Sequence, residues 1–265
     1  MLVKNMNIIV CIKQVPETTE VRIDPQTNTL IREGIASIIN PFDMYAIEEA
    51  IRLKEQQGGQ VTAITMGPPQ AESALRQAVA LGVDRAVLLS DQAFAGADTW
   101  ATSYTLAVAI KKLGNFDLII CGKQASDGDT AQVGPGISVH LNIPQITYVK
   151  RIEEINIDDI RAERMTEEGF EIISSPLPCL LSVVKEINEP RLPSLKGMIK
   201  AKKIEIMNWS NNDLNLDADK IGLDGSLTEV IKIFTPPARR GGQIFEGEIH
   251  QSVNKLVDLL KKDIL

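Results

Sequence analysis

The chain has 265 residues, of which 44% are hydrophobic and 24% charged, and its formal net charge is -7 at pH 7. These values are typical of a folded globular protein with a full core, either one large domain or one domain with an arm. The acidic balance argues against a nucleic-acid partner, because phosphate binding requires a concentrated basic face.

The first predicted element is a strand over residues 8–12, a continuous apolar run bounded by turn residues. Such a run is typical of a strand buried on both faces of a parallel sheet. Five residues are too few for the apolar part of a signal peptide, and no other run approaches the roughly 18 residues of a spanning helix. We therefore expect a cytoplasmic chain with no membrane insertion.

Strands and helices then alternate as far as about Leu141. A helix is expected from Asp43, a plausible N-cap, to a stop at Gly58. Further helices are expected over residues 68–82 and 99–113, with strands over residues 60–67, 86–90 and 116–122. This alternation predicts an α/β fold with an open, mainly parallel sheet and right-handed crossovers.

Two parts of the chain depart from that alternation. Residues 21–33 alternate and turn like a β-hairpin. After Pro144, short alternating runs over residues 145–155, 159–165, 170–175 and 179–187 favour antiparallel strands.

Residues 190–206 and the polar stretch at residues 208–226 follow these strands and indicate an excursion from the core, packed on something else. The last predicted helix, residues 248–262, has one apolar face formed by Ile249, Val253, Leu256, Val257 and Leu260. It either closes its own domain or docks on a partner subunit.

Metal or nucleophilic chemistry finds little support in the residue types. Cys11, Cys121 and Cys179 each lie in an apolar run, which favours buried thiols in a reducing compartment. With two histidines in the chain, a zinc site and histidine-based proton chemistry are not expected. Acidic residues gather near turns, where a solvated face is the better interpretation than a metal cluster: Glu153, Glu154, Asp158, Asp159, Glu167 and Glu168.

A polar loop, "GKQASDGDTAQVGP" at residues 122–135, follows the apolar strand that ends near Cys121. It contains neither a P-loop nor a GxGxxG motif. Ligands of open α/β sheets bind beyond the carboxyl ends of the strands, where residues 11–20 and 40–43 are expected to meet this loop.

The helix after this loop is predicted to begin near Asp129 or Thr130 and to contain Gly134, Pro135 and Gly136. These residues disfavour a helix interior, which suggests that backbone comes close to a ligand. An ordinary kinked connection is the alternative.

The chemistry of the loop favours a nucleotide over an ion. Backbone amides of residues 129–132 at a helix N-terminus would accept a phosphate. Lys123 could supply positive charge, and Gln124 or Asp127 could bond a ribose or a base. No Ser-His or Cys-His arrangement is available for nucleophilic catalysis, so no catalytic residue is assigned.

Six segments occur in the order and at about the spacing seen in beta subunits of electron-transfer flavoproteins, and the resemblance covers nearly the whole chain: "CIKQVPETTEVRID", "NPFDMYAIEEAIRLKE", "GKQASDGDTAQVGP", "AERMTEEGFEIISSPLPCLLS", "EPRLPSLKGMIKAKK" and "PPARRGG". Residues 1–5, which precede the family's usual start, are the main departure.

The resemblance implies a Rossmann-like core with helices on both faces, antiparallel additions and a C-terminal arm that packs on an alpha subunit. It divides the chain into residues 1–189 and 190–265. The family's adenine-nucleotide site maps onto Cys11, Lys13, Asn40, Pro41, Phe42, Asp43, Met66, Gly122, Lys123, Gln124, Ala125, Asp127, Gly128, Asp129, Thr130, Ala131, Gln132 and Val133.

The family has two branches. "KQVPETTE" and "DGDTAQVGP" resemble the electron-bifurcating branch, with Glu17 where that pattern has aspartate. Membership of this branch implies FAD and NAD(H) in the beta subunit and electron transfer between NADH, ferredoxin and a flavin-dependent dehydrogenase. The alternative is the ordinary branch, which holds a structural AMP in place of that FAD.

The resemblance also implies a dehydrogenase partner of the acyl-CoA or 2-hydroxy-acid (lactate) type, recognised through Leu195 with Met198 and Ile199 beside it. A helix packed within the chain is the alternative for this segment. As one subunit of an oxidoreductase complex, the chain is expected to be inactive alone. An ATP-hydrolysing or adenylylating enzyme is a third possibility, which the lack of a glycine-rich loop after the first strand disfavours.

Overall fold

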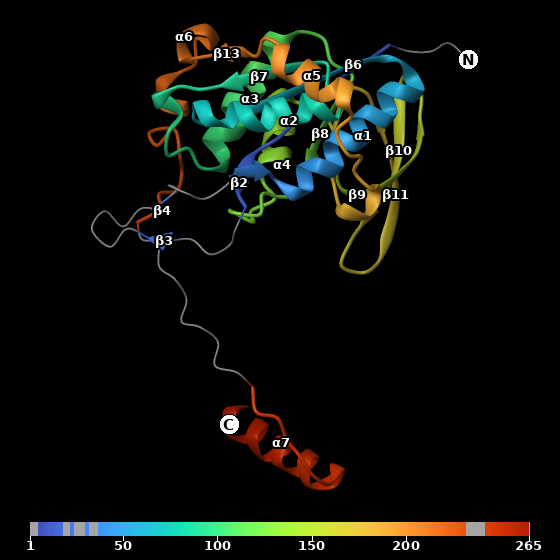
Figure 1. The fold of residues 1–265 in the computed structure, drawn as a ribbon, viewed down its shortest axis with the longest axis vertical. Coiled ribbons are helices and arrows are strands. Elements are labelled where there is room, and N and C mark those ends of the chain that lie inside the picture. The colour runs from blue at the N-terminus through green and yellow to red at the C-terminus, as the bar shows by residue number, and fades with distance from the viewer. Residues whose placement is uncertain (1–4, 18–21, 24–29, 32–36, 232–241, 265) are drawn as a thin grey trace.

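The computed structural model describes residues 5–17, 22–23, 30–31, 37–231 and 242–264. Nine strands within these ranges form one sheet in the order β11-β10-β9-β12-β8-β1-β6-β7-β13 (Figure 1). Their bounds are β1 Met6–Cys11, β6 Gly59–Met66, β7 Arg85–Leu89, β8 Leu118–Gly122, β9 Gln145–Ile155, β10 Asp159–Met165, β11 Phe170–Pro176, β12 Cys179–Val183 and β13 Met207–Trp209.

The helices of the described residues are α1 Pro41–Gln57, α2 Glu72–Leu81, α3 Thr99–Leu113, α4 Val133–Leu141, α5 Leu195–Lys203, α6 Asn211–Leu214 and α7 Ile249–Ile264. Two short antiparallel pairs accompany the sheet: β2 Gln14–Pro16 with β5 Ser37–Ile39, and β3 Arg22–Ile23 with β4 Leu30–Ile31. The second pair confirms a hairpin at those four residues, and the other positions of residues 21–33 lie outside the described ranges.

Parallel pairing dominates the centre of the sheet. Strand β1 pairs in parallel with both β6 and β8, and the parallel order continues through β7 to β13 on one side and to β12 on the other. The predicted α/β fold with a mainly parallel sheet is therefore confirmed. Because the central strands are parallel, their carboxyl ends meet at one edge.

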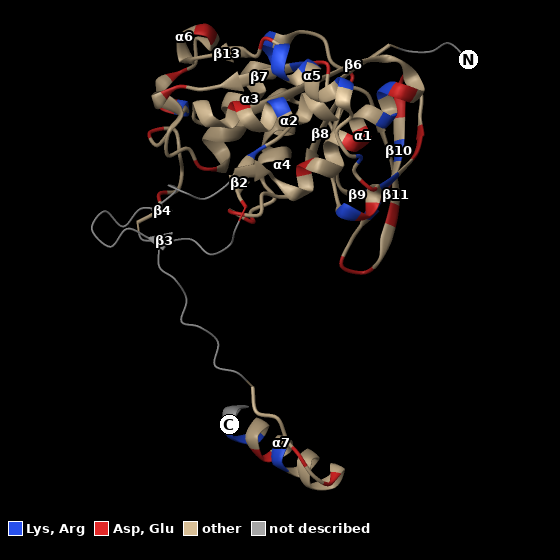
Figure 2. Ribbon diagram, in the orientation of Figure 1, with Lys and Arg blue, Asp and Glu red and all other residues tan. Residues whose placement is uncertain are grey.

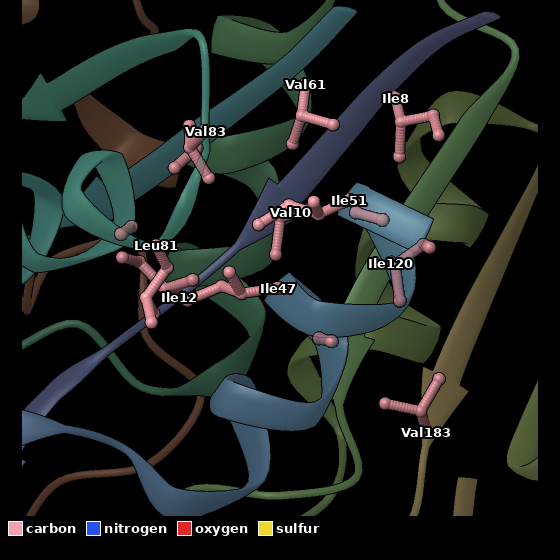
Figure 3. Close-up of a cluster of buried hydrophobic side chains, with 14 of the residues drawn as sticks. Ile8, Val10, Ile12, Ile47, Ile51, Val61, Leu81, Val83, Ile120 and Val183 are labelled. Carbon is pink, nitrogen blue, oxygen red and sulfur yellow. The ribbon is translucent and has the colours of Figure 1, made fainter. Parts of the chain in front are cut away.

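Strand β1 explains why helices are needed on both faces. Its residues alternate between two buried clusters: Ile8 and Val10 pack with α1 and α2, and Ile9 and Cys11 pack with α3 and α4. Figure 3 shows the first cluster, where Ile47 and Ile51 of α1 lie over the sheet. Each fully buried aliphatic side chain contributes about 1.5–3 kcal/mol, so both helix layers stabilise this strand.

The antiparallel prediction after Pro144 is confirmed for three strands and wrong for the fourth. β10 pairs antiparallel with β9 and with β11, whereas β12 lies between β8 and β9 and is parallel to both. All five residues of β12 are buried, and burial on both faces is typical of a parallel strand. Glu153 lies within β9, not at a turn tip, and pairs with Arg151 and Arg161.

The last described helix differs from the others in its surroundings. α7 confirms the helix predicted near the C-terminus, and Figure 1 shows it well apart from the sheet and the helices that cover it. The division of the chain at residues 189 and 190 stays a prediction. Among the described helices, none is long and apolar enough to cross a membrane.

Candidate functional site

The sheet brings the predicted site segments to one edge. Since β1 pairs with β6 on one side and with β8 on the other, the residues that follow these strands are neighbours. Cys11 and Gly122 end β1 and β8, and Met66 ends β6. The segment after β1, the start of α1 and the loop after β8 therefore meet, as the sequence predicts.

Asn40 joins these three segments through hydrogen bonds. Its backbone amide donates to the Lys13 carbonyl at 2.8 Å. Its side-chain amide donates to the Gln124 carbonyl at 2.8 Å, and its side-chain oxygen accepts from the Ser126 amide at 3.0 Å. Asn40 is buried, so these bonds are protected from water and fix the loop after β8 to the start of α1.

Asp43 makes a second brace from inside α1. The N-cap is Asn40, one residue before Pro41, so the prediction of Asp43 as the cap is wrong. Proline at the first helical position needs no hydrogen-bond partner, which explains the earlier start. The buried Asp43 carboxylate instead accepts from the Lys13 amide at 2.7 Å and from the Gly122 amide at 3.2 Å.

Burial determines the charge state of Asp43. Burial raises the pKa of this carboxyl to about 7, although hydrogen bonds from Lys13, Asn40 and Gly122 lower it. Gly122 permits the close contact, because a β-carbon there would lie 2.4 Å from Asp43 Oδ1 and 2.6 Å from the Phe42 carbonyl carbon. A larger residue at position 122 would separate the loop from α1.

Charged side chains lie where the segment after β1 meets the loop after β8. Lys13 Nζ donates to both carboxylate oxygens of Asp127, at 2.7 and 2.8 Å. Lys123 lies over the ring of Tyr148, with 5.4 Å between Nζ and the ring centroid. Both lysines are therefore at the loops and partly exposed, where a phosphate could attract them.

The loop itself is exposed and has an unusual backbone. Residues 126–130 are exposed, and Asp129 and Ala131 have φ angles of 54° and 55°. This left-handed conformation costs a residue with a β-carbon about 1–2 kcal/mol. The Asp129 amide donates to the Ala125 carbonyl at 2.8 Å, and Gln124 donates to the Asp129 carboxylate, so the loop is held in a tight turn.

Helix α4 begins later than predicted. It starts at Val133 with Gln132 as N-cap, so residues 129–132 belong to the loop. Pro135 lies in the first turn, where a missing amide costs little. A β-carbon at Gly134 would lie 2.7 Å from Cys121 Sγ, and one at Gly136 would lie 2.5 Å from Ser103 Oγ. These glycines thus allow α4 to pack closely on β8 and α3, which is a packing reason for their presence. The predicted approach of backbone to a ligand stays a prediction.

The cysteines are part of the core. Cys11 and Cys121 are register partners on β1 and β8, and all three cysteines are free and buried. Burial raises the pKa of Cys11 and of Cys179 to about 12, which keeps both thiols neutral. Cys11 therefore contributes backbone, not a reactive side chain, to the edge of the sheet.

Within the described residues, no group of three or more histidine, cysteine, aspartate or glutamate side chains is placed to hold a metal ion. Two residues that the sequence did not single out also contact the loop. Thr99, at the start of α3, donates to Gln132 Oε1 at 3.1 Å, and Tyr148 lies beside Lys123. The sequence gives no indication of these two contacts, because each joins segments that are far apart in the chain.

The segment predicted to bind a dehydrogenase forms α5. Leu195, Met198 and Ile199 are 72%, 44% and 50% exposed, although α5 as a whole packs on the core. Basic residues accompany them along the helix (Figure 2). α5 is therefore both a helix packed within the chain and an exposed apolar surface with a basic rim.

Comparison with known proteins identifies the class to which this fold and these loops belong. Residues 27–214 match the electron transfer flavoprotein domain. The electron transfer flavoprotein subunit beta of Thermoanaerobacterium thermosaccharolyticum is 54% identical over 256 residues, covering 96% of this chain and 98% of the relative. The chain belongs to the electron transfer flavoprotein family, among its beta subunits.

Two further relatives carry more specific names. The caffeyl-CoA reductase-Etf complex subunit CarD of Acetobacterium woodii is 49% identical over 261 residues, covering 97% of this chain and 98% of the relative. Protein FixA of Bradyrhizobium diazoefficiens is 44% identical over 262 residues, covering 96% of this chain and 91% of the relative.

Proposed function

We propose that the chain binds FAD and NAD(H) as the beta subunit of an electron-bifurcating flavoprotein. In this role it passes electrons between NADH, ferredoxin and a flavin-dependent dehydrogenase. The observation that carries the proposal is the loop at residues 122–132, braced by Asn40 and Asp43 beside the segment after β1. Similarity to CarD and FixA, together with "KQVPETTE" and "DGDTAQVGP", supports the bifurcating branch.

The residues present fit an adenine dinucleotide. A β-carbon at Gly128 would have no neighbour within 4 Å, so this part of the loop has open space around it. The exposed residues Asp127, Gly128 and Thr130 could offer backbone amides to phosphate groups, and Lys13 and Lys123 could offer their ammonium groups. Gln124, Thr130 and Gln132 offer neutral polar groups for the ribose and the base.

FAD supplies the one- and two-electron redox chemistry when bound, and no side chain of this subunit has to act as acid, base or nucleophile. The chain's residues instead position and enclose the nucleotide. Asn40 and Asp43 keep the two loops at a fixed separation. Lys13 would exchange its bond with Asp127 for a phosphate, because a phosphate oxygen is an equally strong charge-assisted acceptor.

We assign two partners to two surfaces. The apolar face of α7 docks on an alpha subunit, and the exposed residues Leu195, Met198 and Ile199 of α5 dock on the dehydrogenase. The complex-forming relative CarD supports an acyl-CoA type of dehydrogenase, with the 2-hydroxy-acid type as the other candidate. We place the whole assembly in the cytoplasm.

Cofactor analysis tests the proposal. The chain is co-expressed with its alpha subunit, the heterodimer is denatured, and FAD and AMP are quantified by chromatography. Two FAD and no AMP per heterodimer, followed by NADH-dependent ferredoxin reduction, are the expected results. One FAD with one AMP would contradict bifurcation and leave a simple electron carrier.

A further inference from the structure

The docking helix α5 is seated on α2 through its smallest residues. A β-carbon at Gly197 would lie 2.0 Å from the Ala80 carbonyl oxygen, so the two helices touch there. Ala201, one turn further, is buried at the same contact. This seating turns Leu195, Met198 and Ile199 outward. The orientation of α5 on the core thus decides what a partner meets.

A dense polar network fixes the segment that leads into α5. Arg191 Nε donates to Glu48 Oε2 at 2.8 Å and its Nη1 donates to Glu55 Oε1 at 2.6 Å. The Arg191 backbone amide donates to the same Glu48 oxygen at 3.1 Å. Arg52 Nε donates to Glu48 Oε1 at 2.7 Å. Two carboxylates of α1 therefore hold Arg191 by its side chain and its backbone.

Glu48 is unusual for a surface clamp because its side chain is 4% exposed. Burial alone would raise the pKa of this carboxyl, but hydrogen bonds from Arg191 and Arg52 hold it below its ordinary value. A buried carboxylate that loses its partner is costly, so the chain is strongly held in the clamped arrangement.

Neighbouring contacts leave little freedom on either side of the clamp. Asn188 donates to the Tyr45 carbonyl at 3.0 Å and to Glu49 Oε2 at 2.9 Å. Pro190 and Pro193 flank Arg191 and restrict the backbone. At the far end of α5, Arg76 donates to the Ala201 carbonyl at 2.6 Å. The segment is thus tied to α1 before the helix and to α2 after it.

We propose that Arg191 and Glu48 are positioning residues that fix the docking surface before the dehydrogenase arrives. This inference rests on the proposed role of α5 in dehydrogenase recognition. The clamp presents Leu192, Leu195, Met198 and Ile199 as one preformed apolar surface, of which Leu192 is an added member. A preformed surface binds more tightly because its ordering cost is not incurred on docking.

The same clamp ties the segment before α5 to α1, and Asp43 in the first turn of α1 braces the nucleotide loops. Helix α1, with 17 residues, therefore contacts both the nucleotide loops and the segment that leads into α5.

The test compares variants in the complete heterodimer with its bound nucleotide. Arg191→Lys keeps the charge and loses the planar fork, and Arg191→Ala leaves Glu48 without its main partner. We expect the KM for the dehydrogenase to rise about threefold in R191K and about tenfold in R191A. At saturating dehydrogenase, kcat and flavin content stay within about twofold, because the nucleotide loops are untouched.

Limited trypsin digestion gives a second readout that needs no dehydrogenase. Cleavage after Lys196, Lys200, Lys202 and Lys203 is expected to accelerate in both variants, since trypsin requires a locally opened chain. Arg161→Lys, which changes an exposed ion pair on β10, is the matched control and leaves both readouts unchanged.

Two results would overturn the inference. Unchanged KM and unchanged cleavage in R191A would show that Arg191 does not position α5. Loss of flavin or of assembly in both Arg191 variants would show that the clamp serves the whole core. Leu195→Ala separates this inference from the proposed function: if L195A leaves KM unchanged, dehydrogenase recognition by α5 fails, and if only L195A raises KM, the clamp fails alone.

Discussion

Helices α5 and α7 both expose apolar side chains, but they are held very differently. α5 is seated on α2 at Gly197 and tied to the core at both ends. α7 lies well apart from the sheet, and about half of the surface of Val253, Leu256, Val257 and Leu260 is exposed (Figure 1). The two helices thus expose similar apolar side chains, but α5 is held firmly on the core and α7 is not.

The difference indicates two kinds of partner. A fixed surface can bind and release a partner repeatedly, because neither event changes the fold of the chain. An isolated amphipathic helix of this length is marginal in water and gains its stability from whatever covers its apolar face. We therefore interpret α5 as the site of an exchanging partner and α7 as the site of a permanent one.

The largest expected effect comes from charging the apolar face of α7. Replacing Leu256 and Leu260 by glutamate should weaken assembly with the alpha subunit by at least about a hundredfold, since each buried leucine contributes about 1.5–3 kcal/mol. Sedimentation of the purified pair measures the loss. The isolated chain should keep its Tm, and a lower Tm would show that α7 closes its own domain.

The next effect is a pH dependence of stability that arises in α1. The segment before α5 is clamped to this helix, whereas α7 lies apart from it. Because burial raises the pKa of Asp43 to about 7 from 3.8, the protonated form favours folding. The free energy of unfolding should therefore fall as pH rises from about 4 to about 7, by on the order of 3 kcal/mol. In the Asp43→Asn variant, the free energy of unfolding measured by urea titration should not show this decrease with pH.

Asparagine at position 43 keeps a single acceptor oxygen, so the variant also loses one of the two hydrogen bonds accepted from the Lys13 and Gly122 amides, at a cost of about 1 kcal/mol at low pH. Glu167→Gln, on the exposed turn between β10 and β11, is the control and should keep the wild-type pH profile. An unchanged profile in D43N would show that another group titrates.

A smaller effect is expected at Gly197, where α5 packs on α2. Gly197→Val should destabilise the chain by about 2 kcal/mol, because the new side chain meets the Ala80 carbonyl oxygen. Thermal unfolding measures the loss, and the KM for the dehydrogenase should rise with it. Gly242→Ala, at a position with no neighbour within 4 Å, is the matched control. An unaffected Tm in G197V would contradict the seating.

The smallest effect concerns charge. Among the described carboxylates none forms an ion pair with Lys196, Lys202 or Lys203, so these cations are available to an acidic rim on the dehydrogenase. Replacing all three by glutamine should slow docking about threefold at low salt and have no effect at high salt. Stopped-flow mixing measures the rate, with Lys185→Gln as control. Equal slowing at both salt concentrations would exclude a charge effect.

Local patterns predicted much of the fold. The apolar run at residues 8–12, the Gly58 and Gly82 stops and the helix over residues 99–113 all follow from short-range rules, and the structure confirms them. The prediction for β12 is wrong in direction, because a run of four apolar residues and one serine does not reveal which strands lie beside it. The parts of the fold that local patterns do not predict depend on contacts between segments that are far apart in the chain.

The candidate site shows the same division. The sequence placed residues 40–43 and 122–133 at one edge, and the structure brings them together. It did not reveal that Asp43 is buried, that Gly134 contacts Cys121, or that Arg191 grips Glu48. Each of these depends on how closely two elements pack, which no periodicity encodes.

Hydrogen exchange of α5 and α7, measured by mass spectrometry in the isolated chain and in the heterodimer, tests the central comparison most directly. Amides of α5 should be protected in both samples, whereas amides of α7 should exchange freely in the isolated chain and become protected on assembly. Protection of α7 in the isolated chain, or protection of α5 only after assembly, would contradict this prediction.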